Sequence, residues 1–270
     1  MKKLGTVVLA LCLLLAGCVG EPAPGAEPVW SDPVPPNEYD RQAFGVVDGF
    51  LRYGAGECFV GVDVSSHQGE IDWAQVAEAG VEFAMIRAGW RGYTEGVLHE
   101  DESFRANMDG ALAAGLEVGV YFFSQAVREE EAVEEAEFLL TLIEGYDLTY
   151  PVVYDWERQS GENSRTRNTD GETQTLCAIA FCRTVEAAGY LPMVYFSPSK
   201  GYGELELERL MEWPFWLAHY TPDWQPTSFR YHFDIWQYTQ EGSVPGIEGD
   251  VDLDLSLRDF SAGERTEGTP

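Results

Sequence analysis

The sequence predicts an α/β fold, a modified (β/α)8 TIM-like barrel in which helices are missing from the C-terminal half. Three times along the chain, at Gly80, Gly115 and Gly189, a helical segment ends at Ala-Gly and a run of strand formers follows within a few residues. This repeat is typical of parallel strands that are joined by helical crossovers. After Tyr195 the strand-like runs follow one another too closely for a crossover helix between them.

The individual elements follow from apolar periodicity and from residues that favour helix ends. Ordered structure is expected to begin near Phe59, and Asp72 and Asp170 are suited to cap the helices that follow them. The predicted helices cover residues 73–79, 104–113, 129–143 and 173–187, with at most a short helix over 205–211. The predicted strands cover residues 59–64, 81–88, 118–123, 150–157, 192–196, 215–220, 234–239 and 249–255.

The first residues indicate that the chain is exported. Lys2 and Lys3 precede an apolar stretch that leads to Leu15-Ala-Gly-Cys18, which resembles a bacterial lipoprotein signal with cleavage before Cys18 and lipid on its sulfur. The alternative is a plain secretory signal or a membrane anchor, although the apolar stretch is short for a bilayer. We expect a signal peptide over 1–17, a disordered Pro/Gly/Glu-rich tether and lead-in over 18–57, the barrel over 58–259 and a disordered tail over 260–270.

The composition is that of a globular protein with an acidic surface. The 270 residues are 45% hydrophobic and 13% aromatic, and acidic residues outnumber basic ones by 46 to 17, for a net charge of -29. This charge argues against nucleic acid as a partner, because phosphate binding needs clustered Lys and Arg, and it favours a neutral or weakly charged substrate. The Cys and His residues show no metal-binding spacing, so we expect neither a metal nor a cofactor. The protein is also expected to be a monomer.

One predicted strand ends in two carboxylates. Asp155 and Glu157 follow the apolar run that begins at Tyr150, and residues two apart on a strand project to the same face. The carboxyl ends of the strands are where α/β barrels place their chemistry. Burial and mutual repulsion would hold one proton on such a pair near neutral pH. The alternative is a structural strand end that caps the next helix or pairs with Arg158.

Further acids and many aromatic residues lie near the other strand ends. Asp63 is one, and the last strand supplies another among Asp250, Asp252 and Asp254. Acids beside aromatic rings, without a basic cluster, suit a sugar, because rings stack on pyranose faces and carboxylates bind hydroxyl groups. Single aromatic residues on strands usually belong to a core, so their number beside the acids is the better indication: Tyr121, Phe122, Tyr154, Tyr195, Trp216, Tyr220, Trp236 and Tyr238.

Seven short motifs follow one another along the chain: Asp63-Val-Ser-Ser-His-Gln-Gly69, Phe83-Ala-Met-Ile-Arg-Ala-Gly89, Gly119-Val-Tyr-Phe-Phe-Ser124, Asp155-Trp-Glu157, Trp216-Leu-Ala-His-Tyr220, Trp236-Gln-Tyr238 and Val251-Asp-Leu-Asp254. In this order they resemble the glycoside hydrolase family 25 lysozymes, also called the Chalaropsis type. Each motif is weak alone, and the seven in order are specific. The resemblance covers residues 59 to 257, nearly the whole predicted barrel.

The resemblance implies an N-acetylmuramidase that cuts the β-1,4 bond between N-acetylmuramic acid and N-acetylglucosamine in peptidoglycan. It implies that Glu157 is the general acid and that Asp155 orients the 2-acetamido group of the substrate or stabilises charge developing on it. Asp63 and Asp252 would line the same floor. Inversion, a covalent intermediate and acetamido assistance all stay open. The substrate-binding set that we infer is Arg87, Tyr121, Tyr195, Trp216, Tyr220, Trp236 and Gln237.

The sequence departs from the family pattern at one position, and two alternative functions stay open. Phe122 replaces the usual His of a Gly-x-Tyr-His strand motif, which is expected to alter a subsite without affecting the acids. We expect no cell-wall-binding repeats after the barrel, and the lipid anchor would replace them by holding the enzyme outside the cytoplasm, at the membrane and facing the wall. The other functions are a glycan-binding lipoprotein without hydrolysis and a related barrel hydrolase that acts on chitin-like glycans.

Overall fold

The computed structural model describes residues 31–159 and 161–261. The predicted signal peptide and Cys18 therefore lie outside the described residues. The barrel belongs to the compact unit that begins at Pro33. None of the helices in the described part of the chain is long and apolar enough to cross a membrane.

Eight strands close into a barrel: β3 (Phe59–Val64), β4 (Phe83–Arg91), β6 (Glu117–Ser124), β7 (Val152–Trp156), β8 (Pro192–Phe196), β9 (Phe215–Ala218), β10 (Ile235–Gly242) and β11 (Val251–Ser256). Every neighbouring pair from β3 through β4 and β6 to β10 is parallel. β11 closes the ring between β10 and β3 and is antiparallel to both. The predicted fold class is thus confirmed, and the direction of β11 is a feature that the sequence did not indicate.

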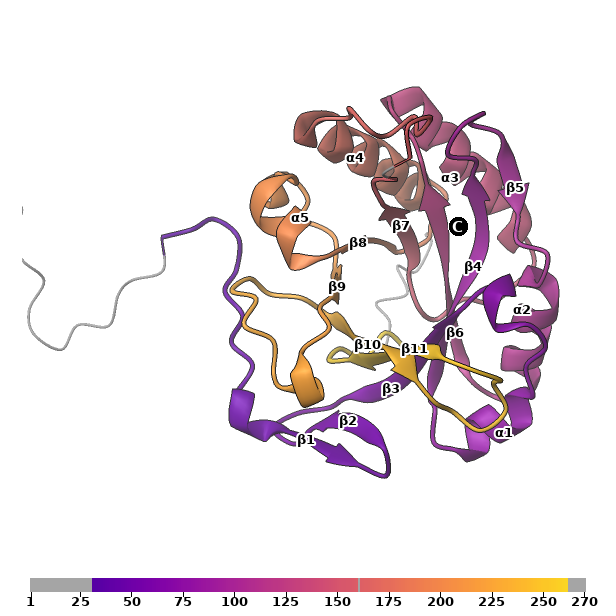
Figure 1. Cartoon of the computed structure of the whole chain (residues 1–270), viewed down its shortest axis with the longest axis vertical. Coiled ribbons are helices and arrows are strands. Elements are labelled where there is room, and N and C mark those ends of the chain that lie inside the picture. The colour runs from indigo at the N-terminus through magenta and orange to yellow at the C-terminus, as the bar shows by residue number, and fades with distance from the viewer. Residues whose placement is uncertain (1–30, 160, 262–270) are drawn as a thin grey trace, which may run out of the picture. The chain divides into compact units, whose positions relative to one another are not determined.

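Helices cover only part of the barrel, as predicted. The helices are α1 (Trp73–Glu78), α2 (Phe104–Ala113), α3 (Glu129–Ile143), α4 (Gly171–Ala187) and α5 (Pro198–Gly203), with 3-10 turns η1 (Arg41–Ala43), η2 (Ser66–Gln68), η3 (Leu207–Arg209) and η4 (Pro222–Trp224). Figure 1 shows α1 to α4 grouped beside β4, β6 and β7, whereas no labelled helix lies beside β10 and β11. A short strand, β5 (Leu98–Glu100), pairs with β4 outside the ring.

The helix ends are formed as the sequence predicts. Asp72 and Asp170 each accept a backbone N–H from the residue three places along, at 3.2 and 2.8 Å. Gly80, Gly115 and Gly189 have φ values of 98°, 82° and 88°, in the left-handed region that glycine adopts without a Cβ clash. Each Ala-Gly pair therefore turns the chain from the end of a helix into the next strand.

Two apolar layers hold the barrel together. The outer layer packs α1 to α4 against the strands, with residues such as Leu139 and Phe181 fully buried. Inside the ring, a smaller cluster fills the lower part of the barrel: Phe83, Met85, Tyr121, Tyr150, Val153, Met193, Trp216, Ile235 and Phe260. Gly61 makes room for this cluster, because a Cβ there would lie 2.2 Å from the Phe83 ring.

Ordered structure begins earlier than the sequence analysis predicted. A hairpin of β1 (Phe44–Val47) and β2 (Phe50–Tyr53) precedes the barrel, so the assignment of residues 18–57 to a disordered tether and lead-in is wrong for this segment. The turn is Asp48-Gly49, with φ values of 52° and 85°, which is a strong hairpin signal. Phe44 and the buried Leu51 pack against the outside of β10, where Leu51 N donates to the Tyr238 hydroxyl at 3.3 Å.

Candidate active site

A cavity of about 390 Å³ opens at the carboxyl ends of the parallel strands. Its walls bring together residues from β3, β4, β6, β7, β8, β9, β10 and β11. The lining residues are Asp63, Ser65, His67, Gln68, Arg87, Tyr93, Tyr121, Phe123, Asp155, Glu157, Gln159, Tyr195, Trp216, Tyr220, Gln237, Gln240 and Asp252. All four predicted acids and six of the seven predicted substrate-binding residues are among them.

The acid pair at the end of β7 lines the cavity. Asp155 is buried, with 6% of its surface exposed, and Glu157 is half-buried just beyond the strand. Burial, and then the charge of Glu157, raise the pKa of Asp155 well above its usual range, while Lys200 and Arg87 act in the opposite direction. The Asp155 Oδ1 atom has no hydrogen-bond partner among the described residues. Asp155 is thus the more buried acid of the pair, and the charges of Lys200 and Arg87 favour its ionised form.

Arg158 does not pair with these two acids. The alternative that Asp155 and Glu157 form a structural strand end paired with Arg158 is therefore not supported. The Arg158 guanidinium forms an ion pair with Glu204 at 2.9 Å. Its remaining hydrogen bonds go to the backbone carbonyls of Thr166, Arg167 and Thr169. Asp155 and Glu157 are left facing the cavity instead of an arginine.

The antiparallel direction of β11 decides which aspartate of the last strand reaches the site. Asp252 is paired with Asp63 across the β11–β3 ladder and lines the cavity. Asp254, which is paired with Gly61, lies one step deeper and is fully buried, while Asp250 is exposed outside the strand. Because β11 is reversed, its amino end meets the carboxyl ends of the parallel strands.

Three aspartates on β3 and β11 share one acidic floor. Burial raises the pKa of Asp252 to about 6 and, together with the charge of Asp252, that of Asp254 to about 8. Burial and the charges of Asp252 and Asp254 also raise the pKa of Asp63 well above its usual range. Part of this floor is therefore protonated near neutral pH, since a fully ionised cluster would repel itself in a low-dielectric environment. From the sequence, Asp254 was one of three candidates on the last strand, of which Asp252 was preferred.

Gln237 connects the acidic floor to the aromatic wall. Its Nε2 donates to Asp63 Oδ2 at 2.6 Å, and its Oε1 accepts the hydroxyls of Tyr195 and Tyr220 at 2.9 and 2.7 Å. Tyr220 remains 44% exposed at the mouth of the cavity. The amide thus orients one acid and two aromatic side chains at once.

Trp216 forms the centre of the aromatic wall. Its indole Nε1 donates to Asp254 Oδ1 at 2.8 Å, and its ring meets the rings of Tyr195 and Tyr121 edge to face, with centroids 4.9 and 6.1 Å apart. The indole is held from below by hydrogen bonding and from the sides by aromatic packing. Only a small part of it reaches the cavity, because Trp216 is 1% exposed.

Arg87 is the cation of the lining, and it is already paired. Its Nε donates to Asp101 Oδ2 at 2.8 Å, and its Nη2 lies 2.7 Å from the same oxygen. Nη2 also donates to Ser66 Oγ at 3.2 Å. The guanidinium is therefore fixed in direction and partly neutralised.

Trp236 does not take part in the site, so the sequence-based prediction for this residue is wrong. Successive residues of a strand point to opposite faces, and Gln237 is the one that faces the cavity. Trp236 is fully buried on the outer face, donates its Nε1–H to the His219 carbonyl at 2.9 Å and packs edge to face on Phe44. Phe122 also points outward, against Phe138 of α3, so replacement of a His there does not change the cavity.

Several lining residues were missed from the sequence. Ser65, His67 and Gln68 belong to the polar turn after β3, whose position directly behind Asp63 was a usable signal. Tyr93, Gln159 and Gln240 lie in loops or at a strand end, where no periodicity marks the direction of a side chain. Tyr93 is 58% exposed and widens the apolar rim of the cavity.

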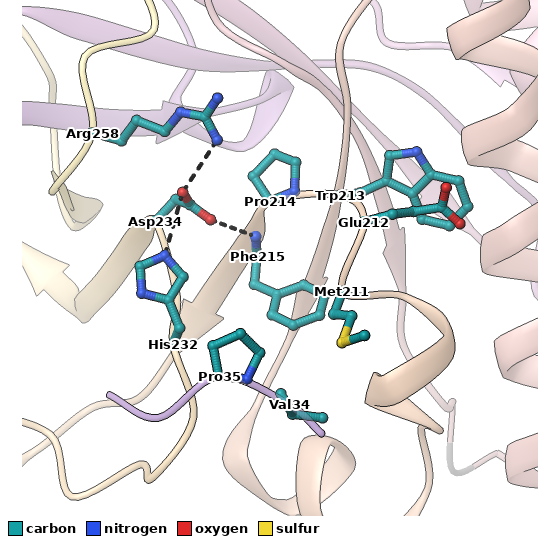
Figure 2. Close-up of a pocket in the computed structure, with 10 residues that line it drawn as sticks. All are labelled: Val34, Pro35, Met211, Glu212, Trp213, Pro214, Phe215, His232, Asp234 and Arg258. Carbon is teal, nitrogen blue, oxygen red and sulfur yellow. Dashed lines mark hydrogen bonds and ion pairs between the residues drawn. The ribbon is translucent and has the colours of Figure 1, made fainter. Parts of the chain in front are cut away.

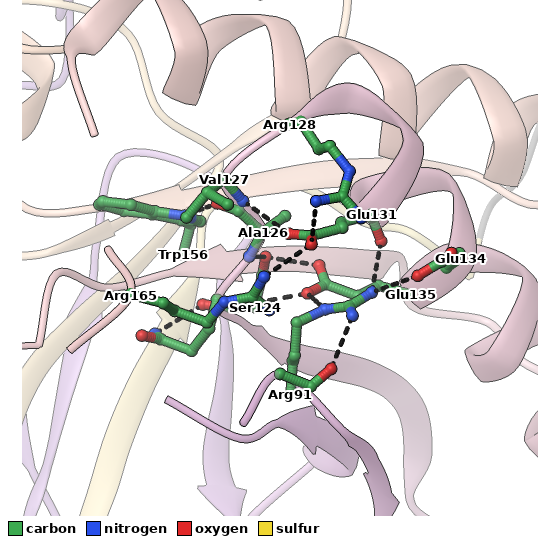
Figure 3. A network of polar contacts seen from close by, with 12 residues as sticks. Arg91, Ser124, Ala126, Val127, Arg128, Glu131, Glu134, Glu135, Trp156 and Arg165 are labelled. Atoms are coloured by element: carbon green, nitrogen blue, oxygen red, sulfur yellow. Dashed lines mark hydrogen bonds and ion pairs between the residues drawn. The ribbon is translucent and has the colours of Figure 1, made fainter. Parts of the chain in front are cut away.

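A buried polar network supports the loop that carries Glu157. Gln125 donates its Nε2–H to the Glu157 carbonyl at 2.7 Å, and its own backbone N–H donates to Glu135 at 3.3 Å. Figure 3 shows Glu135 of α3 between Arg91 and Ser124, with hydrogen bonds of 2.7 and 2.5 Å. Burial raises the pKa of Glu135 to about 7 although Arg91 and Ser124 oppose the shift.

A second arm of the network joins the loops on either side of the cavity. Glu131 accepts from Arg165 Nη2 at 2.6 Å and from Val127 N at 3.0 Å, and the Arg165 backbone N–H donates to the Tyr93 carbonyl at 2.9 Å. The ion pair of Glu131 with Arg165 is visible beside Arg128 in Figure 3. The loops that carry Tyr93 and Glu157 are therefore anchored on one helix, α3.

The other end of the barrel has a smaller pocket without this combination of groups. Its volume is about 160 Å³, and it is lined by two acids, Glu212, which is paired with Arg183, and Asp234. Figure 2 shows Asp234 between Arg258 and His232, at 3.4 and 3.7 Å, while Asp234 also accepts the Phe215 backbone N–H at 3.0 Å. The cavity at the carboxyl ends is therefore the candidate active site.

The fold and the site together define the class of this protein. An α/β barrel whose strand ends present an acid pair beside aromatic walls is suited to a glycan substrate. The chain belongs to the family described as glycosyl hydrolases family 25, whose profile matches residues 62–247. This span contains Asp63, Asp155 and Glu157 and ends before β11.

Two similar proteins are lysozymes. The chain is 29% identical over 209 residues to the autolytic lysozyme of Clostridium acetobutylicum, in an alignment that covers 77% of this chain and 58% of the relative. It is 30% identical over 206 residues to lysozyme M1 of Streptomyces globisporus, with 71% and 65% covered. The chain thus spans less than two thirds of each of these relatives.

Solved structures show the same similarity. The modular autolysin LytC from Streptococcus pneumoniae, in complex with a synthetic peptidoglycan ligand, matches with a TM-score of 0.64 at 27% identity, covering 74% of this chain and 46% of LytC. The bacterial lysozyme from Streptomyces coelicolor matches with a TM-score of 0.62 at 25% identity, covering 74% of this chain and 91% of that structure.

Proposed function

We propose that this protein is a peptidoglycan hydrolase of the lysozyme type, an N-acetylmuramidase that cleaves the β-1,4 bond between N-acetylmuramic acid and N-acetylglucosamine. The observation that carries the proposal is the convergence of Asp155 and Glu157 with Asp63 in one aromatic-walled cavity. The lysozyme relatives and the peptidoglycan ligand of LytC support the choice of substrate.

Glu157 is the general acid in this proposal. Its half-buried side chain lies on the cavity wall, where a glycosidic oxygen can approach it. Glu157 donates its proton to that oxygen as the bond to the anomeric carbon breaks, and a water molecule then supplies a hydroxyl group to the sugar and a proton to the carboxylate. The backbone of Glu157 is held by Gln125, which keeps the acid in a fixed place during this cycle.

Asp155 assists by charge. Positive charge develops on the anomeric carbon or on the 2-acetamido group as the leaving group departs, and a carboxylate in a buried environment stabilises that charge more strongly than one in water. Burial and Glu157 raise the pKa of Asp155, so Asp155 becomes protonated, and activity falls, as the pH decreases. The two acids thus have different environments and different tasks.

The aromatic wall and the amide of Gln237 bind the sugar rings. Tyr195 and Tyr220 offer ring edges and faces for pyranose C–H groups, and Trp216 contributes the small part of its ring that reaches the cavity. Gln237, Asp63 and Asp252 offer hydrogen bonds to hydroxyl or acetamido groups. Arg87 lies at the side of the same cavity and offers a positive charge to a carboxylate such as a lactyl group.

The experiment that tests this function is an assay on purified peptidoglycan. We expect loss of turbidity and the appearance of new reducing ends that belong to N-acetylmuramic acid, with the Glu157→Gln variant as the inactive control. Reducing ends on chitin oligosaccharides alone would support a chitin-like substrate. Cosedimentation with peptidoglycan without any product would support the glycan-binding lipoprotein.

We further propose that the protein works outside the cytoplasm as a monomer held at the membrane by lipid on Cys18. The support is the lipoprotein-like sequence around Cys18, which lies outside the described residues. Its partners would be the peptidoglycan glycan strands and, through the lipid alone, the membrane.

A further inference from the structure

Lys200 has a position unlike that of any other basic residue near the site. The chain has three lysines, Lys2, Lys3 and Lys200. Lys200 is therefore the only lysine among the residues that the structure describes, where arginine supplies all other Lys and Arg side chains. Lys200 belongs to α5, which begins directly after β8 with Pro198 in its first turn. Lys200 does not line the cavity. It lines a small space behind the acid pair, together with Tyr154, Trp156 and Tyr195.

The Lys200 ammonium holds the peptide that joins the two acids. Its Nζ donates a hydrogen bond to the carbonyl of Trp156, the residue between Asp155 and Glu157. The ladder between β7 and β8 ends at the pair Asp155 and Tyr195, whereas on the other side of β7 Trp156 still pairs with Ser124 of β6. Lys200 therefore supplies a donor to Trp156 next to the point where the ladder between β7 and β8 has ended.

Trp156 completes the clamp from the other side. The Lys200 Nζ lies 5.0 Å from the centroid of the Trp156 ring, within cation–π range. The indole Nε1 donates to the Ala126 carbonyl at 2.8 Å, in the same loop that holds Glu157 through Gln125. The residue between the acids is thus fixed through its carbonyl, its ring face and its ring nitrogen.

The charged groups around Lys200 come from two segments, the end of β7 and the end of α5. Asp155 and Glu157 at the end of β7 and Glu204 at the end of α5 favour the charged ammonium, while Arg158 opposes it. Burial is the largest effect and lowers the pKa of Lys200. The hydroxyl groups of Tyr154 and Tyr195 are the other titratable groups beside it.

We propose that Lys200 is a positioning residue for the reaction: it holds the Asp155-Trp-Glu157 segment by its hydrogen bond to the Trp156 carbonyl, and its charge favours the ionised form of Asp155. This inference rests on the proposed glycosidase function. Lys200 acts through Trp156 and by charge, and it touches no substrate. A lysine is suited to the task because a compact ammonium can approach a single carbonyl from behind, whereas a guanidinium is planar and larger.

The first test compares Lys200→Met, Lys200→Arg and a matched control, Arg183→Met. Arg183 stacks over Trp213 at 4.9 Å on the exposed surface of α4, so its loss removes a similar cation far from the acids. We expect Lys200→Met to lower kcat about tenfold or more with KM changed less than about threefold, and to move the acidic limb of the pH profile upward by about half to one pH unit. Lys200→Arg should return the limb to the wild-type position, and Arg183→Met should match the wild type.

Two outcomes of this assay would overturn the proposal. One is a loss of kcat in Lys200→Met with an unmoved acidic limb, which would indicate a structural role alone. The other is a rise in KM that accounts for the whole loss of kcat/KM, which would indicate that Lys200 binds substrate.

A second measurement does not depend on enzyme activity. It tests the proposal even if Lys200→Met does not fold. In protein labelled with 13C-lysine, the Cε signal of Lys200 is assigned by its absence from Lys200→Arg. We expect Asp155→Asn to lower the pKa of Lys200, because a neighbouring negative charge is removed. An unchanged titration would overturn the inference. If the wild-type protein does not hydrolyse peptidoglycan but this shift is observed, the proposed function is refuted, whereas the electrostatic coupling between Lys200 and Asp155 is supported.

Discussion

Gln237 on β10 donates a hydrogen bond of 2.6 Å to Asp63 on β3, and this bond spans 174 positions of the sequence. The same amide accepts the hydroxyls of Tyr195 and Tyr220. We expect Gln237→Leu to lower kcat/KM roughly 10- to 100-fold, because three hydrogen bonds that orient the site are lost while the volume is kept.

The pH profile of this variant provides an independent check. The hydrogen bond from Gln237 lowers the pKa of Asp63, so its loss should raise that pKa and move the pH dependence upward. Gln225→Leu, at an exposed position after η4, is the matched control and should behave as wild type. Wild-type kcat/KM in Gln237→Leu would show that the amide does not orient the site.

The two acids of β7 should separate in their response to the leaving group. Glu157→Gln keeps the shape of the side chain but cannot protonate the leaving oxygen, so we expect a loss of about 10²- to 10⁴-fold in kcat on peptidoglycan, roughly 3 to 6 kcal/mol of barrier. Glycan binding should persist in this variant. Asp155→Asn should also be slow, because an amide cannot stabilise developing positive charge.

An activated aryl glycoside tests these two roles, since its leaving group needs no proton. Glu157→Gln should recover much of its cleavage rate on this substrate, and Asp155→Asn should stay slow. Equal recovery of both variants would refute the assignment, as would near wild-type turnover of peptidoglycan by Glu157→Gln.

Much of the fold is predictable because it is encoded locally. The Ala-Gly helix ends at Gly80, Gly115 and Gly189 and the caps at Asp72 and Asp170 are short-range features, and they mark the helices correctly. α2 and α3 have the bounds that the apolar periodicity predicts. The acids of the site were also identifiable, because strand-end carboxylates in a parallel barrel meet at one edge.

Most of the errors concern features that local patterns do not encode. The exception is the hairpin over 44–53, because its Asp48-Gly49 turn is a local signal. Trp236 and Gln237 lie in a strand with both faces buried, so hydrophobicity gave no indication of which face the cavity occupies. The hairpin over 44–53 covers the outer face of β10, which explains both the burial of Trp236 and the missing helices there. The direction of β11 depends on ring closure, a long-range property that also decides between Asp252 and Asp254.

The anchor is tested by location. We expect wild-type protein to partition with membranes and Cys18→Ala to be released or mislocalised, because the lipid would be attached to the Cys18 sulfur. Fractionation followed by immunoblotting measures this, with Cys58→Ala, a cysteine within the described residues, as the control. Unchanged membrane association of Cys18→Ala would refute lipid anchoring at this residue.

Removal of one partner of the buried ion pair between Arg91 and Glu135 should strongly destabilise the protein. Arg91→Met leaves Glu135 buried beside Ser124 without its cation, and we expect a loss of about 3 to 5 kcal/mol in the free energy of unfolding. The double variant Arg91→Met/Glu135→Met should recover most of that loss, because no uncompensated charge is left. Urea unfolding measures both, and equal losses in the single and double variants would contradict the interpretation.

Asp254 should make the stability of the protein fall as the pH rises. Its pKa is about 8 in the folded protein, raised first by burial and then by the charge of Asp252, whereas in the unfolded chain it is close to the ordinary value of 3.8. Between these values the folded state binds more protons than the unfolded state, so the free energy of unfolding decreases with increasing pH. The contribution is fully present below about pH 4 and is lost as the pH rises through about 8.

Asp254→Asn removes this titration, and the Asn oxygen can still accept the indole N–H of Trp216. We expect the decrease in unfolding free energy between pH 5 and pH 8 to be smaller than in wild type by about 1 to 3 kcal/mol, as measured by urea unfolding at both pH values. Asp250→Asn, at an exposed position just before the same strand, should keep the wild-type dependence. Because Asp63 and Asp252 share the floor and titrate with Asp254, part of the slope should remain in the variant. If the unfolding free energy of Asp254→Asn changes with pH as much as that of the wild type, Asp254 is not the group whose protonation causes this pH dependence.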